Sequence, residues 1–211
     1  TGVEAVMIFG VPDTKDEVGS EAYAADGVVQ RGIQAITENT DAYVIGDVCL
    51  CEYTDHGHCG VLEPHAHDDP TLTVKNDDTL ELLADIAVSQ AEAGADMVAP
   101  SSMTDGMVGA IRTALDSAGF EQIPIMSYAA KYESSFYGPF REAADGAPAF
   151  GDRRHYQMDP ANRREAHREL AIDAKEGADV LMVKPAYPNL DTVRDGREEA
   201  DKPGPAHKLH G

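Results

Sequence analysis

The chain has 211 residues, with 38 Asp and Glu against 17 Lys and Arg, which gives a formal net charge of −21 at pH 7. This balance excludes a general nucleic-acid-binding protein, because phosphate backbones need a cationic face, and it also disfavours docking on an anionic membrane. With 42% apolar residues the chain can build a sizeable core. No apolar run reaches the ~20 residues of a membrane span, and the first residues do not have the pattern of a signal peptide.

The negative charge is spread over the whole chain and is not concentrated in a tail, and seven Lys stand against ten Arg. Acidification of the entire surface is typical of proteins from salt-loving organisms, so we expect a halophilic archaeon as the source. The three cysteines are clustered at Cys49, Cys51 and Cys59. An odd, clustered set is not a disulfide framework. It indicates a reducing, cytoplasmic compartment and suits a metal site.

Five short apolar runs predict strands, at residues 6–11, 43–51, 97–99, 123–128 and 180–183. The runs lack alternation, which is typical of strands that are buried on both faces. Helical patterns lie between them, at residues 77–93, 105–118 and 159–176, and each is followed by a glycine that reads as a stop signal. Strands that alternate with helices predict an α/β fold with a parallel sheet.

This alternation favours a TIM (β/α)8 barrel that is present only in part, because a full barrel needs about 250 residues and only about five βα units are visible. An open doubly wound sheet is the alternative, but no Gly-rich phosphate loop follows the first strand. Residues 137–157 are too long for a plain connection and predict a lid. We assign residues 1–194 to the partial barrel and residues 195–211 to an atypical polar tail.

Two of the seven lysines close apolar strands: Lys131 ends IPIMSYAAK and Lys184 ends VLMVK. A single lysine there could simply extend its ammonium group into water, but two of them in an acidic, Lys-poor chain favour a function. Burial and a neighbouring cation both lower the pKa of an amine, and a neutral amine attacks a carbonyl to form a Schiff base. At the C-terminal ends of barrel strands, these lysines predict imine chemistry on a keto substrate.

The cysteines predict a metal site. Cys49 and Cys51 share one face of an extended strand, and Cys59 returns through a Gly-containing loop. Three protein thiolates leave a fourth position for water or substrate, which is the pattern of catalytic zinc. Two alternatives stay open: His56 or His58 could complete a closed structural site, or the thiols could be buried without a metal.

Other polar residues could complete an active site. Asp47 lies two residues before Cys49 on the same strand face, where it could act as an acid or base or stand solvated at an edge. Arg141, Arg153 and Arg154 lie in the predicted lid. Guanidinium groups hold carboxylates by paired hydrogen bonds, which favours a carboxylate substrate. Salt bridges within the lid are the alternative.

Five segments in this order resemble the porphobilinogen synthase family, also called 5-aminolevulinate dehydratase. They are DVCLCEYTDHGHCG (47–60), VAPSSMTDGMVGAIRTAL (98–115), SYAAKYESSFYGPFREAA (127–144), YQMDPANRREA (156–166) and GADVLMVKPA (177–186). The resemblance implies a TIM barrel with an N-terminal arm, usually in a homo-octamer. It also implies the activity, which is the condensation of two 5-aminolevulinate molecules into porphobilinogen with loss of two waters, in tetrapyrrole (heme) biosynthesis.

The resemblance implies roles for individual residues. Lys184 would form a Schiff base with the substrate that becomes the propionate side, Lys131 would bind the second, acetate-side substrate, and Asp47 would stand near the metal. The Cys triad matches the zinc-dependent members, in which the metal is a Lewis acid, whereas other members use magnesium. The substrate pocket would include Ser101, Phe136, Tyr137, Arg141, Arg153 and Gln157. Glu169 matches a carboxylate of an allosteric magnesium site.

The chain departs from the family pattern in two ways. Ser102 stands where the family usually has Asp. By the resemblance, the chain also begins near the second barrel strand and stops after the sixth, so we expect the arm, the first strand and the last two strands to be missing. A truncated gene product would account for this, and such a chain could be inactive or unstable alone.

Two other functions stay open. One is a Schiff-base, class I type aldolase on the same barrel, with the cysteines in a structural zinc site. The other is an inactive zinc-binding fragment. Borohydride trapping of 5-aminolevulinate at Lys184 would separate the two enzymes, and zinc-dependent porphobilinogen formation would exclude the inactive fragment.

Overall fold

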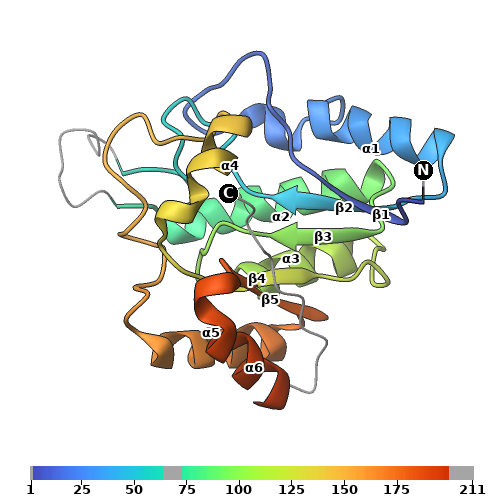
Figure 1. Cartoon of the computed structure of the whole chain (residues 1–211). Helices are drawn as coiled ribbons and strands as arrows, with labels where there is room; N and C mark the ends of the chain where they lie inside the picture. Colours follow the sequence, from blue (N-terminus) through green and yellow to red (C-terminus); the bar gives the residue numbers. More distant parts are fainter. Residues whose placement is uncertain (1, 64–72, 200–211) are drawn as a thin grey trace.

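The structure is a computed structural model that describes residues 2–63 and 73–199, in which strands alternate with helices (Figure 1). The strands are β1 (Ala5–Ile8), β2 (Tyr43–Val48), β3 (Met97–Pro100), β4 (Met126–Lys131) and β5 (Val180–Lys184). The α-helices are α1 (Val28–Asn39), α2 (Asn76–Glu92), α3 (Met107–Ser117), α4 (Gly138–Ala143), α5 (Arg163–Glu176) and α6 (Leu190–Glu199). The predicted α/β class is confirmed.

The strands pair in parallel, as predicted. β1, β2 and β3 form one sheet in chain order, and β4 pairs with β5, with Lys131 opposite Lys184. A single parallel bridge between Val98 and Ile125 links β3 to β4. Both β2 and β3 point toward the side of the molecule where α4 lies (Figure 1). The residues that follow these strands are therefore gathered under α4.

The main core lies between the first sheet and the helices α1, α2 and α3. Its largest side chains with essentially no exposure are Ile33, Leu50, Leu83, Ile86, Ile111, Leu115 and Ile125. Burial of each such side chain contributes roughly 1.5–3 kcal/mol of hydrophobic free energy. All six residues of β4 are buried as well, which explains why its sequence shows no alternation. This rigid base positions the strand ends.

The predicted helix ends are confirmed more closely than the predicted starts. Gly94, Gly119 and Gly177 follow α2, α3 and α5 with φ of 101°, 86° and 111°, a left-handed conformation that glycine adopts without strain. The starts predicted at residues 105 and 159 are wrong, because α3 begins at Met107 and α5 at Arg163. Asn162 caps α5, since its side chain accepts the backbone N–H of Glu165.

Three helices were not predicted. α1 fills the connection from β1 to β2, α4 lies within the predicted lid, and α6 runs past Arg194 to Glu199. Residues 200–211 of the predicted tail lie outside the described residues, so the boundary between barrel and tail stays a prediction. Within residues 2–63 and 73–199, no helix combines the length and hydropathy that crossing a bilayer requires.

A buried carboxyl group between α5 and β4 predicts pH-dependent stability. Asp173 accepts a hydrogen bond from Ser127 Oγ at 2.5 Å, and burial raises its pKa from 3.8 to about 7. Between these values the folded chain keeps a proton that the unfolded chain releases, so stability falls as pH rises, by up to about 1.4 kcal/mol per pH unit. Urea unfolding of Asp173→Asn from pH 4 to pH 8 should show a shallower slope than the parent. An unchanged slope would contradict this assignment.

Candidate active site

A small cavity lies at the C-terminal ends of the strands, beneath α4. It is lined by Phe9, Asp47, Cys51, Glu52, Ser101, Lys131, Tyr137, Phe140, Arg141, Arg153, Gln157 and Lys184. The structure thus brings together most of the predicted site residues. The free volume is about 10 Å³, which has room for one water at most. Any larger ligand therefore requires movement of the predicted lid, residues 137–157, to enter this cavity.

The two lysines are neighbours at the ends of paired strands, and Lys184 is the one whose amine is poised to be neutral. Its Nζ lies 4.5 Å from the ring centroid of Phe140, 5.0 Å from that of Tyr128 and 5.7 Å from that of Tyr137. Burial in this aromatic setting, followed by the positive charge of Lys131, lowers the pKa of Lys184 to about 8. About a tenth of this amine is therefore neutral and nucleophilic at pH 7, far more than for a lysine with an ordinary pKa.

Lys131 behaves differently, which corrects the expectation that both amines would be neutral. Its Nζ donates a hydrogen bond to the carbonyl oxygen of Ser101. Burial by itself would lower the pKa of Lys131, but negative charge in the nearby cysteine cluster, at Cys59 first, raises the pKa above its ordinary value. Lys131 is thus a cation, suited to binding and not to nucleophilic attack while the thiolate charge is uncompensated.

Two buried carboxyl groups accompany the lysines. Asp47 accepts a hydrogen bond from Ser101 Oγ at 3.2 Å, and its other oxygen is buried with no hydrogen-bond partner in residues 2–63 and 73–199. Burial and then the charge of Glu52 raise the pKa of Asp47 to about 7, although Lys131 and Lys184 act in the opposite direction. Asp47 can therefore exchange a proton near neutrality. Glu52 is only 3% exposed. Glu52 was not predicted as a site residue, although its position directly after Cys51 could have indicated it.

The three cysteines form one buried cluster. Their sulfur atoms all lie within 4.8 Å of one another, and those of Cys49 and Cys51 are 3.3 Å apart. Zinc–sulfur bonds of about 2.3 Å in tetrahedral geometry separate the sulfurs by about 3.8 Å, so these donors fit a thiophilic cation. Hydrogen bonds from the Cys49 and Cys51 thiols, followed by the charges of Arg153 and Lys131, hold the pKa of Cys59 well below its usual range.

The neighbouring histidines use their ring nitrogens elsewhere. His58 contacts the Tyr156 hydroxyl at 3.0 Å and the Phe150 carbonyl oxygen at 2.9 Å. His56 contacts the Glu17 carbonyl oxygen at 3.1 Å and accepts the His58 N–H. Among the described residues, the group that could hold a metal ion consists of the three cysteines. The arrangement favours a three-thiol site with an open position over a site closed by histidine.

The lid supplies polar groups that lack partners. Among the residues that the structure describes, Arg141 Nε, Arg153 Nε and both amide atoms of Gln157 are buried without a hydrogen-bond partner. Buried polar atoms are nearly always satisfied, so these three residues are prepared for a polar ligand such as a carboxylate. Arg154 is different, because it is exposed and lies 3.6 Å from Glu133. It fits the salt-bridge alternative.

The predicted site residues Phe136 and Glu169 lie outside both this cavity and the thiol cluster. Phe136 is 51% exposed and does not line it. The aromatic wall consists instead of Tyr137, Phe140 from α4 and Phe9 from the segment after β1, and the rings of Phe9 and Phe140 meet edge to face at 5.0 Å. Glu169 lies on α5, where it lines a separate cavity with Asp105, Arg168, Asp173 and Glu176.

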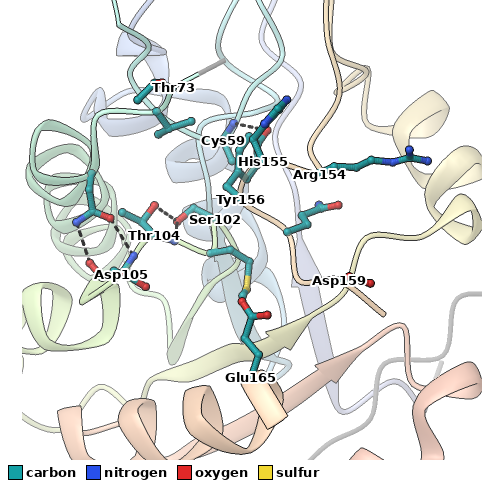
Figure 2. Close-up of a pocket in the computed structure, with 14 residues that line it drawn as sticks. Cys59, Thr73, Ser102, Thr104, Asp105, Arg154, His155, Tyr156, Asp159 and Glu165 are labelled. Atoms are coloured by element: carbon teal, nitrogen blue, oxygen red, sulfur yellow. Dashed lines mark hydrogen bonds between the residues drawn. The ribbon is translucent and has the colours of Figure 1, made fainter. Parts of the chain in front are cut away.

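A larger cavity of about 590 Å³ opens beside Cys59 (Figure 2). Ser102, the departure from the family pattern, lies in its wall, with its hydroxyl 2.8 Å from Thr104 Oγ1. Gln157 lines this cavity as well as the smaller one. The thiol cluster is thus approached from two sides, since Cys51 faces the smaller cavity and Cys59 the larger.

Comparisons with known proteins agree with this geometry. The family described as delta-aminolevulinic acid dehydratase matches residues 1–211. A delta-aminolevulinic acid dehydratase from Staphylococcus aureus is 54% identical over 211 residues, which are 100% of this chain and 64% of the relative. The Toxoplasma gondii ME49 enzyme, solved in complex with the reaction product porphobilinogen, has a TM-score of 0.93 and 44% identity over 99% of this chain and 59% of that one.

A more distant structure shares the fold alone. A putative phosphonomutase from Burkholderia cenocepacia J2315 has a TM-score of 0.52 at 15% identity, over 99% of this chain and 71% of that one. The present chain spans about 64% of the length of the curated Staphylococcus aureus relatives. The match to the family extends over every described strand and over the segments that carry both lysines and all three cysteines. The chain belongs to the delta-aminolevulinic acid dehydratase family.

Proposed function

We propose that this chain carries porphobilinogen synthase chemistry, a lyase reaction in which two molecules of 5-aminolevulinate condense with loss of two waters. The observation that carries the proposal is the pair of buried lysines, Lys131 and Lys184, at paired strand ends beside three clustered thiols. The Toxoplasma relative with bound porphobilinogen supports it. An aldolase would use one reactive lysine and would not need the thiol cluster.

In this proposal, the neutral amine of Lys184 attacks the ketone carbon of the first substrate. A C=N bond forms and the carbonyl oxygen leaves as water, so the step is balanced by proton transfers alone. Asp47, whose pKa is raised to about 7 by burial, can give and take those protons. The cation of Lys131 and the Ser101 hydroxyl bind and orient the second substrate. The aromatic ring of Phe140 excludes water from the imine.

The lid residues complete this assignment. Arg141, Arg153 and Gln157 bind substrate carboxylate, which supplies partners for their unpaired buried atoms. Tyr137 closes the wall, and its hydroxyl donates to the carbonyl oxygens of Tyr132 and Lys184 at 2.7 and 3.0 Å. We assign no substrate contact to Phe136.

Cys49, Cys51 and Cys59 would hold a divalent cation, and thiolate donors favour zinc over magnesium. When bound, this ion supplies Lewis-acid polarisation of the second substrate's carbonyl group. Glu169 would take part in a separate magnesium site on α5, where the carboxyl groups of Asp105 and Glu176 line the same cavity.

The same proposal includes the setting of the enzyme. The five βα units would be part of an eight-stranded TIM barrel, assembled in a homo-octamer and located in the cytoplasm. The net charge of −21 supports a halophilic archaeal source. Circular dichroism across a KCl series tests this last point, because full structure at low salt would contradict it.

The direct test is porphobilinogen formation by this chain with 5-aminolevulinate, followed colorimetrically. We expect the activity to be lost on chelation and restored by zinc. Covalent trapping at Lys184 without any porphobilinogen would favour the aldolase. Zinc binding with neither adduct nor product would identify an inactive zinc-binding fragment.

The pKa of Lys184 sets the expected pH profile of imine formation. With a pKa of about 8, about a tenth of the amine is neutral at pH 7 and about nine-tenths at pH 9. The initial rate of adduct trapping by cyanoborohydride in the metal-free chain should therefore rise about tenfold over this interval and then level off. Lys131→Met removes a neighbouring positive charge and should move the midpoint to higher pH. A flat profile would contradict the assignment.

A further inference from the structure

The lid lies directly against the segment that carries the third cysteine. Three backbone carbonyl groups take part: Ala149 N–H donates to the His56 oxygen at 3.0 Å, Arg153 Nη2 donates to the Gly57 oxygen at 2.9 Å, and His58 Nε2 contacts the Phe150 oxygen at 2.9 Å. The two backbones are close, because a Cβ at Gly57 would lie 2.4 Å from the carbonyl oxygen of Ala147. The two segments are therefore packed against each other.

The hydrogen-bond directions around His58 follow from the chemistry of its partners. A carbonyl oxygen only accepts, so the His58 Nε2 atom that faces Phe150 carries the proton. The other ring nitrogen, Nδ1, then accepts, and the Tyr156 hydroxyl at 3.0 Å donates to it. The Tyr156 oxygen is left to accept the backbone N–H of Cys59 at 3.4 Å, the contact drawn as a dashed line in Figure 2.

These hydrogen bonds connect the lid to Cys59, one of the three candidate metal ligands. Phe150 and Tyr156 belong to the lid, while His58 and Cys59 belong to the thiol segment. The His58 side chain has no exposed surface, so water cannot replace a lost partner and each bond counts at its full value. The lid must move to admit substrate, because the small cavity has room for about 10 Å³.

We propose that His58 and Tyr156 are positioning residues that couple occupancy of the thiol site to closure of the lid. A cation held by Cys59 fixes the backbone of that residue, and the Tyr156–His58 pair transmits this restraint to residues 150–156. The lid then presents Arg153 and Gln157 in the closed arrangement. The proposal rests on the proposed function only for the reason why the lid closes, which is to enclose substrate. The coupling itself requires no substrate.

Hydrogen–deuterium exchange with Zn²⁺ and no substrate tests this coupling in the full chain. In the parent, zinc should slow exchange of lid peptides by roughly fivefold, which corresponds to one net hydrogen bond. Tyr156→Phe removes the hydroxyl that links His58 to Cys59. This variant should still bind zinc, with affinity reduced by about 10–100-fold as for other outer contacts of metal ligands, but saturating zinc should no longer slow the lid.

The controls separate coupling from general stability. Tyr43→Phe is a matched control, because it too removes a tyrosine hydroxyl that takes part in a hydrogen bond. The Tyr43 hydroxyl donates to the backbone carbonyl oxygen of Asp96 at 3.0 Å, at the end of β2 that lies away from the cysteines. This variant should keep the parental zinc effect. Exchange in α2 and α3 reports whether a variant is folded. If Tyr156→Phe unfolds, His58→Gln, which keeps a donor toward Phe150, replaces it with the same expectation.

Two results would overturn the proposal. The first is that zinc slows hydrogen–deuterium exchange of the lid equally in the parent and in a folded Tyr156→Phe or His58→Gln variant. The second is that zinc binds to the parent without any effect on the lid. Neither result depends on porphobilinogen formation, so failure of the coupling is distinguishable from failure of the proposed function.

Discussion

Replacing Lys184 by methionine should abolish covalent trapping of 5-aminolevulinate and reduce porphobilinogen formation by at least ~10³-fold, because no other group can take over a positioned nucleophile. Methionine keeps the volume and removes the amine. In the metal-free chain the neighbouring amine of Lys131 is not a substitute in trapping, since negative charge in the cysteine cluster, at Cys59 first, holds its pKa above its ordinary value against the effect of burial. Borohydride reduction followed by peptide mass mapping measures the adduct directly.

The matched control for this experiment is Lys175→Met. Lys175 lies in the last turn of α5 and is exposed, so its replacement changes the net charge by the same amount and should leave the adduct intact. An adduct of normal yield in Lys184→Met that maps to Lys131 would reverse the roles of the two lysines. Loss of the adduct in the control as well would indicate a nonspecific effect of charge.

Replacing Cys59 by serine should weaken zinc binding by roughly 100-fold. Structural zinc sites with four ligands bind with about 10–16 kcal/mol, so one ligand contributes roughly 3 kcal/mol. Cys59 is the thiol whose pKa is lowered by hydrogen bonds from Cys49 and Cys51, and it is therefore the thiolate that is present before metal arrives. Competition against a chromogenic chelator gives the affinity of each variant.

Two comparisons sharpen the cysteine experiment. Ser101→Ala changes a hydroxyl that bonds Asp47 in the same cavity and should leave zinc affinity within a few-fold, because the hydroxyl does not belong to the thiol cluster. Magnesium should not displace zinc, since thiolates favour the softer ion. Unchanged zinc affinity in Cys59→Ser, Cys49→Ser and Cys51→Ser would place the zinc site elsewhere in the protein.

Much of the fold could be read from local patterns. Apolar runs bounded by glycines located all five strands to within a few residues, because strands buried on both faces must be continuously apolar. The glycines after α2, α3 and α5 marked the helix ends, because each adopts positive φ. The starts of α3 and α5 were less predictable, because an acidic residue is favourable both as the N-cap of a helix and in a turn that precedes the helix. α1 was not predicted, because its helical pattern was treated as part of the connection between β1 and β2.

In the candidate site, too, some features follow from local sequence patterns and others only from tertiary contacts. Asp47 lies on β2 and a lysine ends each of two strands, so residue type and spacing by themselves determined the chemistry that this protein offers: thiols, amines and a carboxyl group at or just after strand ends. The predicted shared strand face of Cys49 and Cys51 is wrong, because β2 ends at Val48 and both cysteines lie in the segment that follows it. Which amine is neutral was decided only in three dimensions. Burial and the charge of Lys131 lower the pKa of Lys184, whereas negative charge at Cys59 raises that of Lys131, and a pKa responds to charges that are close in space, whatever their separation in the chain. The contacts of Tyr156 with His58 and Cys59 likewise join segments that only the tertiary structure brings together.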